Sequence, residues 1–194
     1  MSTMRAILIL LAILAPLRMI GARILCPKVP HVSMTVVCSN ACGTKLLYDN
    51  CINAMRRGGI DSSPSHIEET TVYAILAANQ TLNSYEDTLE ALSFQLQHNT
   101  SLSGSDGDAY QRCMDDYDAA FDTMSVIIHG CLNNCYFEKL VSIYMSSMTS
   151  LESCRDRMLA PWMKMPLLLY PNVERDRNNA VMAYLIGKLL VAYQ

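Results

Sequence analysis

Apolar side chains recur at every third or fourth position through most of this chain, which is the spacing of one face of an α-helix. The longest such stretch runs from Ser65 to Gln97, and we predict a single long helix there because Pro64 suits a first helical turn. Its apolar or small positions are Ile67, Thr71, Ala74, Ala78, Leu82, Tyr85, Leu89, Leu92 and Leu96. The segment HNTSLSGSDGD then interrupts the pattern with serine, glycine and aspartate.

Two shorter stretches after this break have the same helical spacing. In the first, an apolar or small stripe is formed by Ala109, Cys113, Tyr117, Ala120, Met124 and Ile127. The opposite stripe carries Asp115, Asp118 and Asp122, and Gly130 with Asn133-Asn134 predicts the end of this helix. The second stretch predicts another helix through the apolar positions Phe137, Val141, Tyr144, Met148 and Leu151.

The remaining pattern completes an all-α fold. Pro161, Pro166 and Pro171 separate the third helix from a last one, which we predict from about Asp176 to Ala192. No stretch alternates apolar and polar residues for long enough to predict a strand. Four amphipathic helices with short connections favour an antiparallel four-helix bundle over residues 64–193. A smaller helical unit before it has too little apolar surface to fold alone.

The N-terminus has the composition of a secretory signal peptide. Arg5 precedes an apolar run from Ala6 to Leu17, which is too short to span a bilayer comfortably and leads into small residues. We predict a signal peptide at residues 1–22, cleaved after Ala22, then an N-terminal segment at 23–36 and one domain at 37–194. An uncleaved N-terminal anchor is the alternative. We expect a secreted chain with no membrane association after cleavage.

The net charge of the chain limits the class of its partners, and two sequons indicate candidate sites of modification. Removal of residues 1–22 takes away Arg5 and Arg18, so the net charge changes from −3 to −5. A mildly acidic chain without a basic patch argues against a nucleic-acid partner. The sequons Asn79-Gln-Thr81 and Asn99-Thr-Ser101 make Asn79 and Asn99 candidate N-glycosylation sites on the secretory route.

Eight cysteines in a secreted chain indicate disulfide bonds before any other chemistry. Redox catalysis would favour the Cys-x-x-Cys spacing, which is absent from the sequence. Metal binding is disfavoured because no histidine has a paired ligand spacing with the cysteines; the histidines are His31, His66, His98 and His129. The segment CGTKLLYDNC, from Cys42 to Cys51, is therefore interpreted as part of a covalent cross-link, and we expect neither a metal nor a cofactor.

No pattern predicts a catalytic site. His129 fits the C-terminal end of a helix, where a positive charge is favoured. Asp115, Asp118 and Asp122 form one stripe without a buried partner, which favours a solvated face over acid–base chemistry or a metal site. No Gly-x-Ser-x-Gly motif places a nucleophile. The sequence therefore favours a protein that is not an enzyme.

Several motifs occur in a specific order. Eight residues separate Cys42 from Cys51, and the second helix has the pattern Cys113, Tyr117, Ala120, Asp122 and Met124. The third helix contains Met145-Ser-Ser-Met-Thr149 and then reaches Cys154. Pro166-Leu167 lies before the last helix, and Asn179-Ala180-Val181 lies inside it. In this order and spacing, the chain from about Val37 to Val191 resembles the plant invertase inhibitor and pectin methylesterase inhibitor family.

The resemblance implies a fold and a set of disulfides. Members of the family are secreted four-helix bundles with an N-terminal helical hairpin, which would occupy residues 37–58 here. One disulfide staples the hairpin, implying a Cys42–Cys51 bond, and a second ties two bundle helices, implying a Cys113–Cys154 bond. Four cysteines lie outside this set as candidates for further disulfides with three possible connectivities; they are Cys26, Cys38, Cys131 and Cys135.

The resemblance also implies a function, namely non-covalent inhibition of a plant cell-wall pectin methylesterase or of an acid invertase. Many invertase inhibitors carry Pro-Lys-Phe before the last helix, and this chain has Pro161-Trp162-Met163-Lys164, so we prefer the esterase. Candidate contacts with an esterase are Glu86, Glu90, Asp115, Asp118 and Asp122, and Lys164 is the candidate for an invertase. Met145-Ser-Ser-Met-Thr149 replaces the family's usual Ser-Ala-Ala-Leu-Thr. A secreted structural or signalling bundle that does not inhibit is therefore the alternative from another class.

Overall fold

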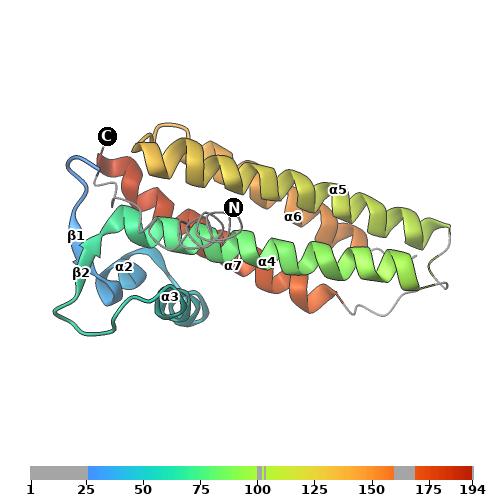
Figure 1. Cartoon of the computed structure of the whole chain (residues 1–194), viewed down its shortest axis with the longest axis horizontal. Coiled ribbons are helices and arrows are strands. Elements are labelled where there is room, and N and C mark those ends of the chain that lie inside the picture. Colours follow the sequence, from blue (N-terminus) through green and yellow to red (C-terminus); the bar gives the residue numbers. More distant parts are fainter. Residues whose placement is uncertain (1–25, 100–101, 103, 160–168, 194) are drawn as a thin grey trace, which may run out of the picture.

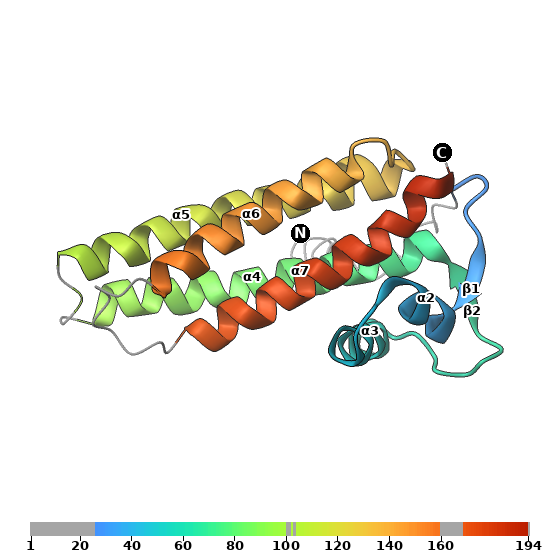
Figure 2. The same ribbon diagram turned by 180° about the vertical axis from the view of Figure 1, so that it is seen from behind.

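The computed structural model describes residues 26–99, 102, 104–159 and 169–193. Its main feature is a set of four long helices, which are α4 (Thr70–His98), α5 (Ser105–Val126), α6 (Leu140–Met158) and α7 (Tyr170–Leu190). Successive helices run in opposite directions (Figures 1 and 2). Each packs against two others in the cyclic order α4, α5, α6, α7. The predicted all-α, antiparallel four-helix bundle is confirmed.

The stripes that predicted the bundle helices form its core. On α5, the predicted positions are buried from Ala109 through Met124, including Tyr117, which has no exposed surface. The fully buried side chains of the other helices include Tyr85 on α4, Tyr144 on α6 and Met182 on α7. Removing apolar surface from water stabilises the folded state by about 25 cal/mol per Å², and this is the main favourable contribution to the folding free energy of such a core.

A short two-stranded sheet was not predicted. Strand β1 (His31–Ser33) pairs antiparallel with β2 (Ile67–Glu69), with Val32 opposite Glu68. Each strand has three residues, which is too short for an alternating pattern to be visible in the sequence. Because residues 67–69 are in β2, α4 begins at Thr70 and not at Ser65, and Ile67 is exposed rather than part of the core.

The ends of α5 and α7 follow from local chemistry. Helix α5 continues through a π-helical turn (Ile127–Cys131) and a 3-10 turn (Leu132–Asn134), and it stops where Cys135 has a left-handed φ of 55°. The predicted end at Asn133-Asn134 agrees with this. Helix α7 begins at Tyr170, earlier than the predicted Asp176. Pro171 lies in its first turn, where the missing N–H of proline has no helical partner to lose.

A helical hairpin precedes the bundle. It consists of α2 (Met34–Ala41) and α3 (Lys45–Arg57), which pack on each other and against α4 and α7 (Figure 2). Thr44 caps α3 by accepting a hydrogen bond of 3.3 Å from the Leu47 N–H. Val37 and Met55 are buried within the same apolar core as the bundle. The hairpin is therefore folded onto the bundle and shares its core, as its small apolar surface led us to expect.

The hairpin disulfide differs from the one that the resemblance implied. The structure bonds Cys38 to Cys51, with a Cα–Cα distance of 5.7 Å, and leaves Cys42 as a buried free thiol. The prediction of a Cys42–Cys51 bond was therefore wrong. Cys38 lies one helical turn before Cys42, so both can approach α3. Cys42 is the C-cap of α2, in extended backbone (φ −100°, ψ 109°), whereas Cys38 lies inside the helix with its side chain fully buried.

Two further disulfides join distant segments. Cys113 on α5 is bonded to Cys154 on α6, the pair that the resemblance implies. Cys26 is bonded to Cys135, which ties the start of the described chain to the connection between α5 and α6. The fourth extra cysteine, Cys131, is a buried free thiol. Burial raises the pKa of both free thiols, Cys42 and Cys131, because it disfavours the thiolate.

Candidate functional site

Helices α4 and α5 form a strongly acidic face. Helix α4 carries Glu86, Asp87 and Glu90 and has no lysine or arginine, and Arg112 is the one cation in the sequence of α5. The candidate contact residues of α5, Asp115, Asp118 and Asp122, are all exposed, as are Glu86 and Glu90. The predicted solvated stripe therefore faces outward. We refer to the exposed carboxylates Glu86, Glu90, Asp115, Asp118 and Asp122 as the acidic face.

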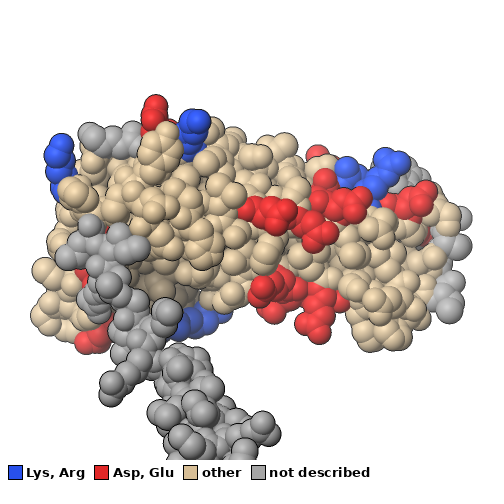
Figure 3. Space-filling view, turned by 45° about the horizontal axis from the view of Figure 1, so that its top comes forward, with Lys and Arg blue, Asp and Glu red and all other residues tan. Residues whose placement is uncertain are grey.

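The two groups of carboxylates lie at the same level of the bundle. The rings of Tyr85 on α4 and Tyr117 on α5 meet edge to face with centroids 5.7 Å apart. Because Glu86 follows Tyr85 and Asp118 follows Tyr117, the exposed carboxylates are brought to neighbouring turns of adjacent antiparallel helices. Figure 3 shows acidic side chains gathered over these two helices, midway along the molecule. Carboxylates far apart in the sequence thus form one negatively charged surface.

Neighbouring helices neutralise other carboxylates that lie off this surface. Asp116 is turned toward α6 and forms an ion pair with Arg157. On α6, Glu152 pairs with Arg155 at 2.6 Å and also with Arg177 of α7. On the acidic face, Asp115 accepts a hydrogen bond of 3.2 Å from the neutral side chain of Gln111. The charge of the acidic face is therefore not cancelled by the ion pairs described between helices.

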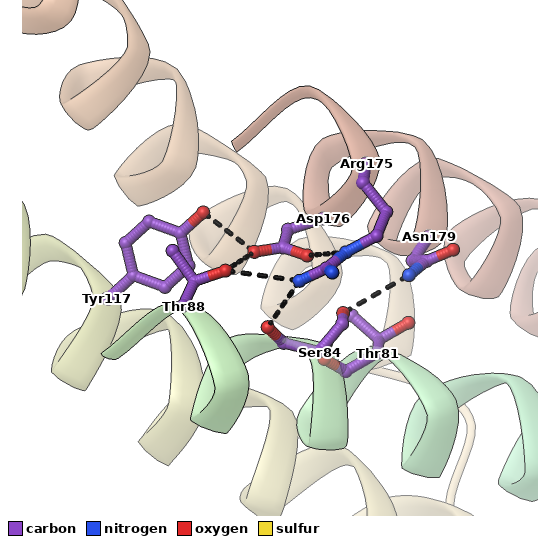
Figure 4. Close-up of polar contacts among 7 residues, drawn as sticks. All are labelled: Thr81, Ser84, Thr88, Tyr117, Arg175, Asp176 and Asn179. Carbon is purple, nitrogen blue, oxygen red and sulfur yellow. Dashed lines mark hydrogen bonds and ion pairs between the residues drawn. The ribbon is translucent and has the colours of Figure 1, made fainter. Parts of the chain in front are cut away.

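A buried polar network lies behind the acidic face and joins α4, α5 and α7 (Figure 4). Its centre is Asp176, whose side chain has no exposed surface. One carboxylate oxygen accepts hydrogen bonds from Thr88 Oγ1 at 2.5 Å and from the Tyr117 hydroxyl at 2.9 Å. The other accepts from Arg175 Nε at 2.9 Å. Three helices are thus held in register by one carboxyl group.

Burial raises the pKa of Asp176 above the ordinary range of an aspartate, because a carboxylate is disfavoured away from water. The hydrogen bonds from Thr88, Arg175 and Tyr117, together with the charge of Arg175, act in the opposite direction. Desolvation is the larger effect. The same burial, with the nearby Asp176 charge, raises the pKa of Tyr117 far above that of a free tyrosine, so its hydroxyl remains a donor.

Further contacts extend this network toward the hairpin end of the bundle. Arg175 Nη2 donates to the Ser84 carbonyl oxygen at 3.2 Å and to Thr88 Oγ1 at 3.3 Å. The amide of Asn179, one turn along α7, donates to Ser84 Oγ at 3.2 Å. Thr81, one turn before Ser84, donates to the Ala77 carbonyl oxygen at 2.9 Å within α4 itself. Helix α4 is thus joined to α7 through Ser84 and Thr88.

Sequence reasoning missed this network. We placed Asp176 only as the start of the last helix and did not single out Arg175. A signal was nevertheless present, since Thr81, Ser84 and Thr88 recur at helical spacing and are all buried. Short polar residues on a buried helical stripe require partners, because an unpaired polar group in a core costs about 1–3 kcal/mol. Such a stripe therefore predicts a polar network, though not the residue at its centre.

Other candidate residues have different placements. Lys164 and the predicted signal peptide lie outside the described residues. Asn79 lies inside α4, half-buried, and Thr81 of its sequon is buried. Asn99 is the C-cap of α4. Glycosylation of Asn79 and Asn99 stays a prediction.

Within the described part of the chain, no helix has the length and apolar character of a membrane span. The same residues hold no group of three or more His, Cys, Asp or Glu side chains arranged to bind a metal ion.

Comparison of the sequence with protein-family models and with curated proteins finds no match. Comparison of the structure finds a mutant form of a pectin methylesterase inhibitor from Arabidopsis, with a TM-score of 0.64 and 14% sequence identity over 81% of this chain and 97% of the other. A pectin methylesterase inhibitor from Arabidopsis thaliana matches with a TM-score of 0.57 and 14% identity, over 80% and 95% of the two chains. This chain therefore has the fold of pectin methylesterase inhibitors.

Proposed function

We propose that this protein is a secreted inhibitor that binds non-covalently to a plant cell-wall pectin methylesterase and covers its active-site cleft. The observation that carries the proposal is the shared fold, which spans nearly the whole length of two pectin methylesterase inhibitors. The order of motifs from Cys113 to Asn179 supports the same conclusion from the sequence. In this proposal the chain itself performs no chemistry.

The build of the molecule suits this role. Three disulfides and a buried network centred on Asp176 fix the positions of the helices before any partner arrives. A preorganised surface loses little conformational entropy on association, which favours tight binding. Disulfides form and persist in oxidising compartments, which supports a location in the cell wall outside the cell.

The acidic face is the surface that we assign to the target. It is exposed, it lies on two helices that are held rigidly by the core, and the ion pairs described elsewhere in the bundle do not neutralise it. Such a surface attracts a partner that presents basic groups around its cleft and accelerates the encounter. We therefore expect Glu86, Glu90, Asp115, Asp118 and Asp122 to act mainly on the rate of association.

The test is a titration of the oxidised chain beginning at Arg23 against a plant pectin methylesterase and, in parallel, against a cell-wall invertase. We expect stoichiometric inhibition of the esterase alone. Inhibition of invertase alone would replace the proposed target, and Lys164 would then be the residue to substitute. A folded protein that inhibits neither enzyme would favour a structural or signalling bundle.

A charge-matched pair of variants tests the surface separately. The triple variant Asp115→Asn, Asp118→Asn and Asp122→Asn should slow association about tenfold, and the loss should shrink at high salt. The control variant Asp61→Asn, Glu138→Gln and Asp156→Asn removes three exposed carboxylates outside α4 and α5. Equal rates for the two variants would remove the acidic face from the interface and leave the proposed inhibition intact.

A further inference from the structure

A cavity of about 470 Å³ lies where the hairpin meets the bundle, on three helices. Helix α3 contributes Asn50, Asn53, Arg56 and Arg57, α4 contributes Gln80, and α7 contributes Arg175 and Asn179. Its volume lies within the range of about 300–1,000 Å³ that is usual for small-molecule sites. The acidic face contributes none of these residues.

The chemistry of this cavity is uniform. Each lining side chain is a guanidinium or a carboxamide, so each one carries N–H donors. Three of them carry a permanent positive charge, and no carboxylate is among the residues described as lining the cavity. The preceding acidic residue of α3, Asp49, is engaged with Lys45 at 2.6 Å. The cavity is therefore a cationic site rich in donors within an acidic protein.

Part of this donor set is held in place by the bundle. Arg175 is fixed by its bonds to Asp176, Ser84 and Thr88, and its Nη1 nitrogen has no hydrogen-bond partner among the described residues. Asn179 is buried and is anchored to Ser84 Oγ. A ligand would thus meet donors whose conformations are already selected, which reduces the entropic cost of binding.

The hairpin supplies two exposed arginines of the set. Arg56 Nε donates to Ser62 Oγ at 3.0 Å, and Arg57 has no partner among the described residues. Both lie in the last turn of α3, where cations are favoured by the helix dipole. That preference explains two arginines at this end of α3. It does not explain Arg175 of α7, or the four amides that α3, α4 and α7 contribute to the cavity.

We propose that this cavity binds a carboxylated sugar, that is, a uronic acid or a short oligomer of one. Guanidinium groups pair with carboxylates through two parallel hydrogen bonds. Arg57 of α3 is free to form such a pair, and Arg175 of α7 offers the donors of its Nη1 nitrogen to the same cavity. Carboxamides both donate and accept, which suits them to sugar hydroxyls, and Asn53, Gln80 and Asn179 line the same cavity as the arginines. The proposal does not rest on inhibition of an enzyme.

The test uses the ¹⁵N-labelled, oxidised chain from Arg23 and nuclear magnetic resonance titration. Trigalacturonate is the probe, and neutral galactotriose and inorganic phosphate are the comparison ligands. We expect trigalacturonate to shift the side-chain amide signals of Asn50, Asn53, Gln80 and Asn179. Arg57→Gln should weaken this binding about tenfold, because a charge-assisted hydrogen bond is lost from an exposed residue that the fold does not use. Arg112→Gln removes an exposed arginine on α5 and should leave the affinity unchanged.

Three results would overturn the proposal. The first is the absence of any shift at these amides with trigalacturonate. The second is equal or tighter binding of phosphate or galactotriose, which would mean that the cavity does not select a carboxylated sugar. The third is the same loss of affinity in the Arg57 and Arg112 variants, which would mean that the affinity depends on the net charge of the protein and not on the cavity. None of these depends on whether the protein inhibits an esterase.

Discussion

The hydroxyl of Tyr117 on α5 donates a hydrogen bond of 2.9 Å to the carboxyl group of Asp176 on α7 (Figure 4). These two helices lie diagonally across the bundle, since each packs mainly against α4 and α6. The bond therefore crosses the core instead of joining neighbours. Apolar contacts alone can be exchanged for one another, whereas this directional bond specifies one relative position of the helices.

Removal of this hydroxyl should destabilise the protein. We expect Tyr117→Phe to lower the free energy of unfolding by about 1.5–3 kcal/mol, the usual value of a hydrogen bond to a charged group. Tyr85→Phe is a matched control, because among the described residues the Tyr85 hydroxyl is hydrogen-bonded only to the neutral Ser147 Oγ, at 3.2 Å. This substitution should cost about 0.5–1.5 kcal/mol. Denaturant unfolding of both variants measures the difference. Equal losses of unfolding free energy would mean that the bond to Asp176 contributes no more than the bond to Ser147.

The raised pKa of Asp176 predicts how stability changes with pH. Its pKa is higher in the folded chain than in the unfolded one, where an aspartate has a pKa of about 3.9, so folding favours the protonated carboxyl. The contribution of Asp176 to the free energy of unfolding should increase as the pH falls from 7 through the raised pKa. It should level off below the unfolded value, and it is lost again as the pH rises.

The measurement is the free energy of unfolding of the wild type minus that of Asp176→Asn, taken from pH 7.5 to pH 4. This difference should be more favourable to the wild type at the acid end. Asp118→Asn, which removes an exposed carboxylate outside the network, is the control for the loss of one negative charge. A difference that is flat, or that grows toward pH 7.5, would contradict the direction assigned to the pKa.

The disulfide of the hairpin is directly testable. Alkylation of the unfolded, unreduced protein should label Cys42 and Cys131 and leave Cys38 and Cys51 unmodified. Cys42→Ala should cost about 1 kcal/mol or less. Adding Cys38→Ala to that variant should cost about 3 kcal/mol more on the chain-entropy model, since Cys42 is then unable to replace the lost partner. Labelling of Cys38 instead of Cys42 would restore the pairing that the sequence resemblance implied.

A close contact between α6 and α7 predicts a sensitive glycine. A Cβ atom at Gly187 would lie 2.6 Å from Cε2 of the fully buried ring of Tyr144. Gly187→Ala should therefore destabilise the protein by about 1–3 kcal/mol, despite the better helix propensity of alanine. At Gly130 the nearest atom would be Val126 Cγ1 at 3.5 Å, so Gly130→Ala is the control. If thermal unfolding shows equal melting temperatures for the two variants, the helices separate more easily than this packing implies.

The sequence by itself determined the bundle, because helical periodicity records which side chains of each segment must leave water. Cys113, Tyr117, Ala120 and Met124 are buried, as their spacing predicts, and Asp115, Asp118 and Asp122 are exposed on the other side. Periodicity is a property of nearby residues, so it was sufficient for the helices and for the acidic face. It also predicted the segment in which α5 ends.

Only the tertiary structure decided which residues meet across those helices. Cys38 and Cys42 are one turn apart on α2, and the choice between them depends on how α3 docks. Asp176 reads as a polar residue at a helix start until α4 and α5 surround it with Thr88 and Tyr117. The cationic cavity likewise exists only where α3 rests on α4 and α7. Contacts of this kind join residues far apart in the chain, and no local pattern of hydrophobic and polar positions records them.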